Sequence, residues 1–137
     1  MGARGPVILW NRILDSVLGP VAPAPSTIPQ DAVPPGVTFR HGRLIPGIGG
    51  IMGRMNGPAA AVTLRRTIVI HPDVQLSPKL LVHELTHVRQ WDEDRLFPIK
   101  YALQSLRHGY LQNRYEVEAR EEAERAFPRT PTTPRNV

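Results

Sequence analysis

The sequence predicts an α+β fold in which a small sheet packs against two amphipathic helices. Thr67–Ile70 is a run of β-branched residues followed by the turn-forming sequence His71-Pro72-Asp73, which predicts a strand. Leu81, Leu85 and Val88 recur at i, i+4 and i+7, the spacing of a helix that packs on a core by one face. A second helical stripe has one small or apolar residue every four positions, namely Leu111, Tyr115, Ala119, Ala123 and Phe127.

Composition limits the architecture and the partners. The chain has 137 residues, of which 41% are hydrophobic, and this suits one domain with a modest core. It contains no cysteine, so disulfides and cysteine-ligated metals are excluded. The formal net charge is +5, but the arginines are spread along the whole chain. No specific nucleic-acid partner is therefore expected, because such binding needs a basic patch.

Residues 1–19 are expected to contain a short amphipathic helix. Its apolar face comprises Leu9, Trp10, Ile13, Leu14 and Val17. Arg12 and Asp15 interrupt the segment, so it is too polar to span a bilayer and makes a poor signal peptide. We expect it to dock on its own domain or on a partner, and the alternative is a helix lying in a membrane interface. The sequence does not fix a location; the lack of cysteine and of a clear signal peptide favours the bacterial cytoplasm.

Prolines and glycines mark the next boundaries. Residues 20–36 hold six prolines and are expected to form an extended linker rather than a packed element. The main domain is expected over residues 37–127. It begins with a strand at Val37–Leu44, and the five glycines of Gly47–Gly57 predict a flexible loop.

The remaining boundaries lie after the apolar stripe of the first predicted helix. Pro98–His108 is expected to form a connecting helix that stops at Gly109. Residues 128–137 form a proline-rich tail, which is expected to be disordered unless it docks. The sequence shows no internal repeat, and it does not determine the oligomeric state.

The most specific pattern is H-E-x-x-H at residues 83–87. On a helix, positions i and i+4 share one face, so His83 and His87 can bind one metal ion. Glu84 lies about 100° further around the helix, within reach of a water held by that metal. Zinc bound in this way lowers the pKa of its water to about 7, and a carboxylate can accept the proton during attack on a carbonyl. Ser77-Pro78 is a good helix opening for this motif.

A third metal ligand is expected from the second helical stripe. Glu116 falls within the arc that this stripe sweeps, and a carboxylate on an inward face is costly unless it is paired or metal-bound. We therefore predict Glu116 as the third ligand and keep Glu118 as the fallback. The other glutamates of this helix are expected to form a solvated face, with i,i+4 pairs such as Glu121–Arg125.

The motif and its surroundings resemble the zincin superfamily. The sequence Leu80–Gln90, with Glu116-x-x-Ala119 in a later helix, is most similar to the gluzincins, whose ligands are two histidines and a glutamate. Small bacterial zincin-like domains found with extracellular contractile injection systems also share a segment similar to Ala61–Ile70. The glutamate element resembles that of CAAX-type membrane proteases too, but those carry an aspartate where this chain has Arg120.

The resemblance implies a zincin-like fold and a zinc metallopeptidase acting on proteins or peptides. It also implies that a strand within Val62–Ile70 borders the cleft and pairs with extended substrate. Glu84 would be the general base for peptide-bond hydrolysis. Hydrolysis passes through an oxyanion that benefits from a donor beside the metal, and His108, Tyr110 or Tyr115 could supply it.

Two other functions compete with this interpretation. One is a non-catalytic zincin-like module that binds or supports a larger assembly. Glu84 argues against it, because a purely structural site needs ligands but no base. The other is a nucleic-acid-associated protease similar to Spartan-like enzymes, which typically complete the site with a third histidine rather than a glutamate.

Overall fold

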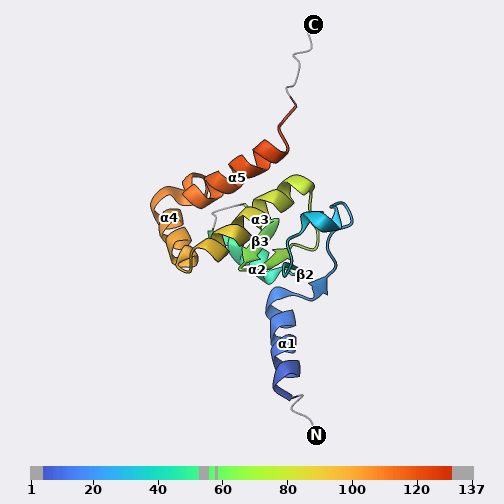
Figure 1. The fold of residues 1–137 in the computed structure, drawn as a ribbon. Helices are drawn as coiled ribbons and strands as arrows, with labels where there is room; N and C mark the ends of the chain where they lie inside the picture. Colours follow the sequence, from blue (N-terminus) through green and yellow to red (C-terminus); the bar gives the residue numbers. More distant parts are fainter. Residues whose placement is uncertain (1–4, 53–55, 58, 131–137) are drawn as a thin grey trace.

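The computed structural model describes residues 5–52, 56–57 and 59–130, and these ranges form an α+β fold (Figure 1). The α+β class expected from the sequence is therefore confirmed. In chain order the elements are α1 (Gly5–Leu18), β1 (Val21–Ala22), the 3-10 turn η1 (Gln30–Ala32), β2 (Thr38–His41), α2 (Leu44–Met52), β3 (Ala61–Leu64), β4 (Thr67–Ile70), α3 (Pro78–Glu93), α4 (Phe97–Gln112) and α5 (Arg114–Ala126).

The four strands form one small mixed sheet in the order β1-β2-β4-β3. β2 runs parallel to β4, whereas β1 and β3 are antiparallel to their neighbours. The strand predicted at Thr67–Ile70 is β4, and its three apolar residues are at most 1% exposed. β3 and β4 form a hairpin whose two-residue turn places Arg65 at a φ of 56°. The stretch 62–70 thus contributes two strands, and β3 is the one at the edge of the sheet.

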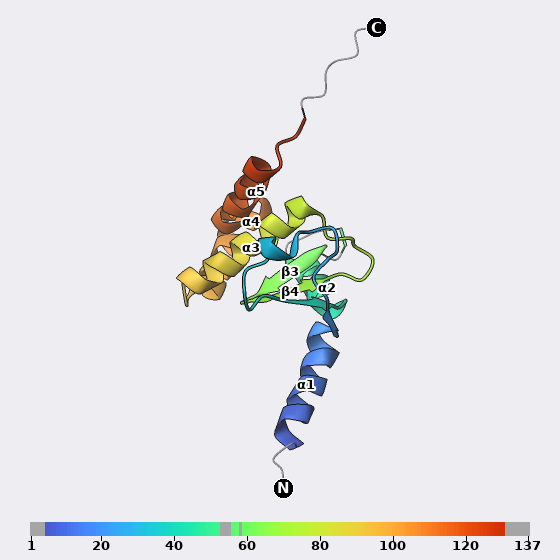
Figure 2. The ribbon, with the colours of Figure 1, turned by 45° about the vertical axis from the view of Figure 1, so that its right-hand side comes forward.

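Helix α3 packs between the sheet and α5 (Figure 2). It begins as predicted, because the Ser77 hydroxyl oxygen accepts a hydrogen bond from the Leu80 N–H at 3.1 Å and proline occupies the first turn. Leu81 and Val88 are 2% and 4% exposed and pack in the core with buried side chains of β2 and β4. The predicted apolar stripe thus faces the core.

Residues 20–36 differ from the expected free linker. Val21–Ala22 forms β1 on the edge of the sheet, and Ile28 is 5% exposed within the core. The Thr27 hydroxyl also donates to the carbonyl of Leu76 at 3.2 Å. Proline restricts the backbone and so lowers the conformational entropy that the unfolded chain loses on folding. A proline-rich segment can therefore still pack an apolar side chain on a core. This stretch belongs to the folded body.

The glycine-rich segment Gly47–Gly57 also differs from the expected loop, because α2 occupies its first half. A Cβ on Gly49 would lie 2.7 Å from Cγ2 of Val62 in β3. This glycine therefore allows the helix to approach the sheet closely, and composition alone does not distinguish that use of glycine from flexibility. Residues 53–55 and 58 lie outside the described part of the chain.

The helix predicted at Pro98–His108 is present as the main part of α4. Gly109 interrupts it with φ 73° and ψ 170°, and a short helical continuation follows before α5. Most of the expected tail, residues 131–137, lies outside the described residues. None of the helices in the described ranges has the length and apolar character needed to cross a bilayer.

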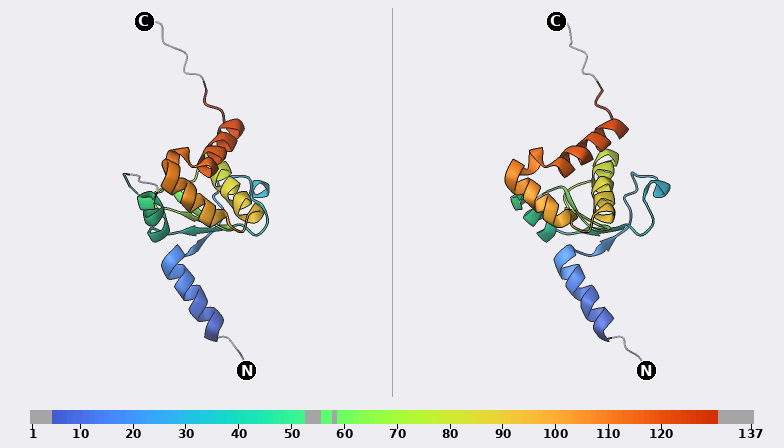
Figure 3. Two further views of the ribbon diagram at one scale, coloured as in Figure 1. Left: turned by 90° about the vertical axis from the view of Figure 1, so that its left-hand side faces the viewer. Right: turned by 60° about the vertical axis from the view of Figure 1, so that its left-hand side comes forward.

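Helix α1 projects from the rest of the fold (Figure 3). The expected apolar face is exposed rather than docked on its own domain, and Trp10 is 64% exposed. The C-terminal part of the helix is anchored by an ion pair of 2.7 Å between Asp15 and Arg40 of β2.

Candidate metal centre

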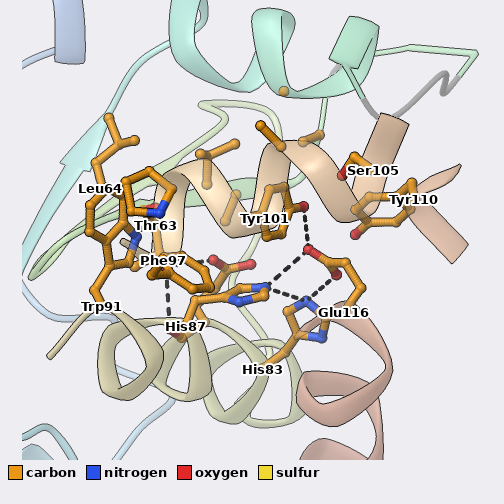
Figure 4. A pocket seen from close by; sticks show the side chains of 17 residues that line it. Thr63, Leu64, His83, His87, Trp91, Phe97, Tyr101, Ser105, Tyr110 and Glu116 are labelled. Carbon is orange, nitrogen blue, oxygen red and sulfur yellow. Dashed lines mark hydrogen bonds and ion pairs between the residues drawn. The ribbon is translucent and has the colours of Figure 1, made fainter. Parts of the chain in front are cut away.

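Two helices that are distant in sequence bring three metal-ligating side chains together. His83 and His87 project from α3, and Glu116 projects from the first turn of α5 (Figure 4). The Nε2 atoms of the two histidines lie 3.2 Å apart. Glu116 places Oε2 3.1 Å from Nε2 of His83 and Oε1 3.2 Å from Nε2 of His87. The predicted trio therefore forms one group positioned to bind a metal ion.

The trio is largely shielded from water, which strengthens its internal electrostatics. Burial opposes the charged forms of Glu116 and His87, but their mutual attraction outweighs burial. The imidazoles of His83 and His87, which lie 3.1 and 3.2 Å from its two oxygens, hold the pKa of Glu116 well below its usual range. In turn, the hydrogen bond and charge of Glu116 raise the pKa of His87 to about 9. In the metal-free protein at neutral pH, a carboxylate therefore faces an imidazolium.

The surroundings of one Glu116 oxygen indicate whether the trio suits a metal ion. Oε2 is buried and makes no hydrogen bond of acceptable geometry within the described residues, although Nε2 of His83 is 3.1 Å away. A buried carboxylate oxygen without a full partner is costly. A cation between the carboxylate and the two imidazoles would remove that cost. The donor set of two nitrogens and one oxygen therefore fits a divalent transition metal.

Glu84 lies beside this group in the same pocket. It is 4% exposed, and its Oε2 accepts a hydrogen bond of 2.7 Å from the Thr63 hydroxyl. Thr63 is part of β3, so the edge strand orients the carboxylate of the motif helix. Sequence reasoning did not single out Thr63, because its place beside Glu84 depends on how β3 lies against α3.

A cavity of about 240 Å³ opens over the trio and Glu84. Apart from these groups its described lining is uncharged, with aromatic side chains from α3 and α4 and the whole of β3. Trp91 packs on Phe97 and donates its indole N–H to the Thr63 carbonyl at 3.2 Å. Trp91, which lies one turn after His87 on α3, therefore lines the cleft.

Two tyrosines of α4 reach this pocket. The Tyr101 hydroxyl donates to Oε1 of Glu116 at 2.6 Å, and Tyr110 also lines the cavity. Burial, reinforced by the charge of Glu116, raises the pKa of both phenols well above the usual value, so both stay protonated. Of the three oxyanion donors suggested by the sequence, only Tyr110 lines the pocket. His108 is exposed, and the hydroxyl of buried Tyr115 accepts from Arg114.

Asn113 fixes the relative positions of α4 and α5. It is fully buried, and its Oδ1 caps α5 by accepting from the N–H of Tyr115 at 3.0 Å. Its Nδ2 donates to the carbonyl of Tyr101 at 3.1 Å and to the hydroxyl of Ser105 at 2.8 Å. One side chain thus holds Tyr101 next to the start of the helix that carries Glu116.

Gln90 completes the surroundings of the trio, and the sequence analysis missed it. It is 4% exposed and lies 2.8 Å from Nδ1 of His87 through its Oε1. A glutamine at i+3 from a ligating histidine shares its helix face, and this spacing could have identified it. Tyr101 offers no comparable pattern in the sequence.

Comparison of the chain with protein-family models, with curated proteins and with solved structures finds no match.

Proposed function

We propose that this protein is a zinc-dependent metallopeptidase with a zincin-like fold of the gluzincin kind. The observation that carries the proposal is that the H-E-x-x-H helix and Glu116 meet in a buried group, as the motif and the helical phase independently predict. The resemblance stated from the sequence supports the same function.

The interatomic distances are compatible with a tetrahedral zinc ion. Ligand atoms at about 2.0–2.1 Å from a tetrahedral zinc ion lie about 3.3–3.4 Å from one another. The two Nε2 atoms lie 3.2 Å apart, and they lie 3.1 and 3.2 Å from different oxygens of Glu116. With one ligand atom from each residue, the three atoms lie within 4.8 Å of one another. Three protein ligands would leave one position open, which is typical of catalytic rather than structural zinc.

Glu84 is assigned as the general base. When bound, zinc supplies a Lewis acid that activates water and polarises the carbonyl. Glu84 accepts the proton of the attacking water and then delivers it to the amine that leaves. The hydrogen bond from Thr63 holds one carboxylate oxygen in place during both transfers.

Tyr110 and Tyr101 are assigned as donors to the oxyanion that forms when water adds to the carbonyl. Both hydroxyls lie in the pocket and both keep their protons, as a hydrogen-bond donor must. Tyr101 donates to Glu116 when no substrate is present, so it would have to turn from that carboxylate to reach the oxyanion.

The substrate is proposed to be an extended peptide that lies along β3. This strand lies at one edge of the sheet and borders the cavity along its whole length. The Thr63 carbonyl already accepts a hydrogen bond from Trp91, so the substrate backbone would pair with the part of β3 nearer Ala61. The uncharged lining favours an apolar side chain beside the scissile bond.

The decisive test compares Glu84→Gln with wild type for zinc content, thermal stability and cleavage of a peptide library. The amide is nearly isosteric but accepts no proton, so we expect full zinc, an unchanged fold and a cleavage rate lower by about 10²–10⁴. Glu93→Gln is the matched control, because Glu93 is on the same helix with a side chain 65% exposed.

Equal cleavage by wild type and Glu84→Gln would remove Glu84 from the mechanism. A wild-type protein that holds zinc fully but cleaves no peptide would instead favour a non-catalytic binding module.

A further inference from the structure

We propose that Gln90 is a positioning residue of the metal centre, which fixes the tautomer of His87 and ties α3 to α5 beside Glu116. This inference rests on the proposed metal binding by the trio, but it does not depend on peptide hydrolysis.

The surroundings of Gln90 determine which way its amide points. Its Nε2 lies 3.2 Å from the Tyr115 carbonyl and 2.8 Å from Oε2 of Glu118. Both partners only accept, so this position belongs to the amide nitrogen. Oε1 then faces Nδ1 of His87 at 2.8 Å, and a carbonyl oxygen only accepts, so His87 carries a proton on Nδ1. Nε2 of His87, the atom within the trio, is therefore the one that binds metal.

Gln90 also joins the two helices that carry the ligands. Tyr115 directly precedes Glu116, so the bond to the Tyr115 carbonyl fixes the spacing of α3 and α5 at the third ligand. Glu118, the other acceptor, is held in turn by Arg89 of α3 at 2.6 Å. Because Gln90 is 4% exposed, water has little access to replace these bonds.

An amide suits this place better than a carboxylate. The pocket already contains Glu84 and Glu116, whose combined charge balances one divalent ion. A carboxylate against His87 would add a third negative charge to a buried site, which is costly. Gln90 orients the imidazole without adding a charge, and its amide separates the carboxylate of Glu118 from His87.

The first experiment replaces Gln90 by methionine, which has a similar shape but no amide. Loss of a group that orients a ligating histidine typically weakens metal binding about 10–100-fold, and we expect this range in chelator competition with zinc. In nitrogen-15 NMR, the Nδ1–H of His87 should exchange slowly with water in wild type and rapidly in Gln90→Met. Gln112→Met is the matched control, because Gln112 is exposed at the end of α4.

The second experiment exchanges the two partners. Gln90→Glu keeps an acceptor for His87, but it repels Glu118 and no longer donates to Tyr115, so zinc binding should weaken. Adding Glu118→Gln restores a donor between the helices, and the double variant should bind zinc about tenfold more tightly than Gln90→Glu alone. This comparison keeps the proposal testable if Gln90→Met fails to fold.

The proposal is overturned if Gln90→Met keeps both the slow Nδ1–H exchange and a zinc affinity within about twofold of wild type. It is also overturned if the exchange of partners recovers no affinity. A wild type that binds zinc and cleaves no peptide would refute the peptidase and leave the role of Gln90 standing, whereas a wild type that binds no zinc overturns both.

Discussion

The two faces of α5 carry the same residue type with opposite consequences. On the face toward α3, the Glu116 side chain is 3% exposed and meets two imidazoles and a tyrosine hydroxyl. On the outer face, Glu121 is 61% exposed and lies 3.9 Å from Arg125. The outer carboxylate is stabilised by water and needs no partner, whereas the inner one is stable only beside positive charge. Helical phase, rather than residue type, separates the candidate ligand from the surface charge.

Glu118 lies between these extremes. Its side chain is 44% exposed and is bound by Arg89 and by Gln90. It therefore contacts a residue that contacts His87, but it lies outside the trio. Its effect on a metal should be indirect.

The largest expected effect is the loss of zinc binding in Glu116→Ala. Removing a ligand should weaken binding by more than the roughly 10–100-fold that outer groups contribute, while Glu118→Ala should fall at or below that range. Competitive chelator titration of both variants measures the difference. If Glu118→Ala proves the more damaging, the assignment of the inner face is wrong.

A second effect is the release of zinc in acid. Only deprotonated ligands bind, so zinc that is stoichiometric at neutral pH should leave as the imidazoles and Glu116 take up protons. Elemental analysis after dialysis over a pH series measures this release. Protein prepared without chelators that contains no zinc, and takes up none on titration, would contradict the inner-face site.

A smaller effect concerns the stability of the metal-free protein. The pKa of His87 is raised from 6.5 to about 9 in the folded state, so its contribution is complete below pH 6.5 and is lost as the pH rises through about 9. The pKa of Glu116 is lowered, so its contribution is present above its usual value of 4.5 and is lost in acid. The free energy of unfolding should therefore decline between pH 6.5 and 9.

Urea unfolding of chelator-treated protein over this pH range tests that decline. Glu116→Gln should flatten it, because the amide carries no charge to pair with His87. Glu124→Gln is the control. Glu124 forms an ion pair with Lys79 in which the side chains are 44% and 38% exposed, and its substitution should leave the pH profile unchanged. A decline that survives in Glu116→Gln would assign the pH dependence to other groups.

The smallest effect belongs to the outer face. Glu121→Ala should change the free energy of unfolding by less than about 1 kcal/mol, because an exposed i,i+4 pair is well solvated and contributes little. Zinc affinity should not change. Thermal unfolding and chelator titration check both statements, and a large loss in either would mean that the two faces of α5 are not independent.

The sequence by itself determined α1, α3, α4, α5 and β4, together with the identity of the trio. Spacing places His83 and His87 on one face, and the stripe through Ala119 predicts the phase of Glu116, because helical periodicity is a property of neighbouring residues. The α+β class and the break at Gly109 follow from local propensities in the same way.

The tertiary structure decided everything that depends on how these elements meet. Tyr101 reaches Glu116 only because Asn113 joins α4 to α5, and Thr63 reaches Glu84 only because β3 lies against α3. The expectations for residues 20–36 and 47–52 were wrong, because proline and glycine report backbone freedom and not the surface that a segment packs against. Periodicity is encoded locally, whereas contacts between distant segments are set by the packing of the whole chain.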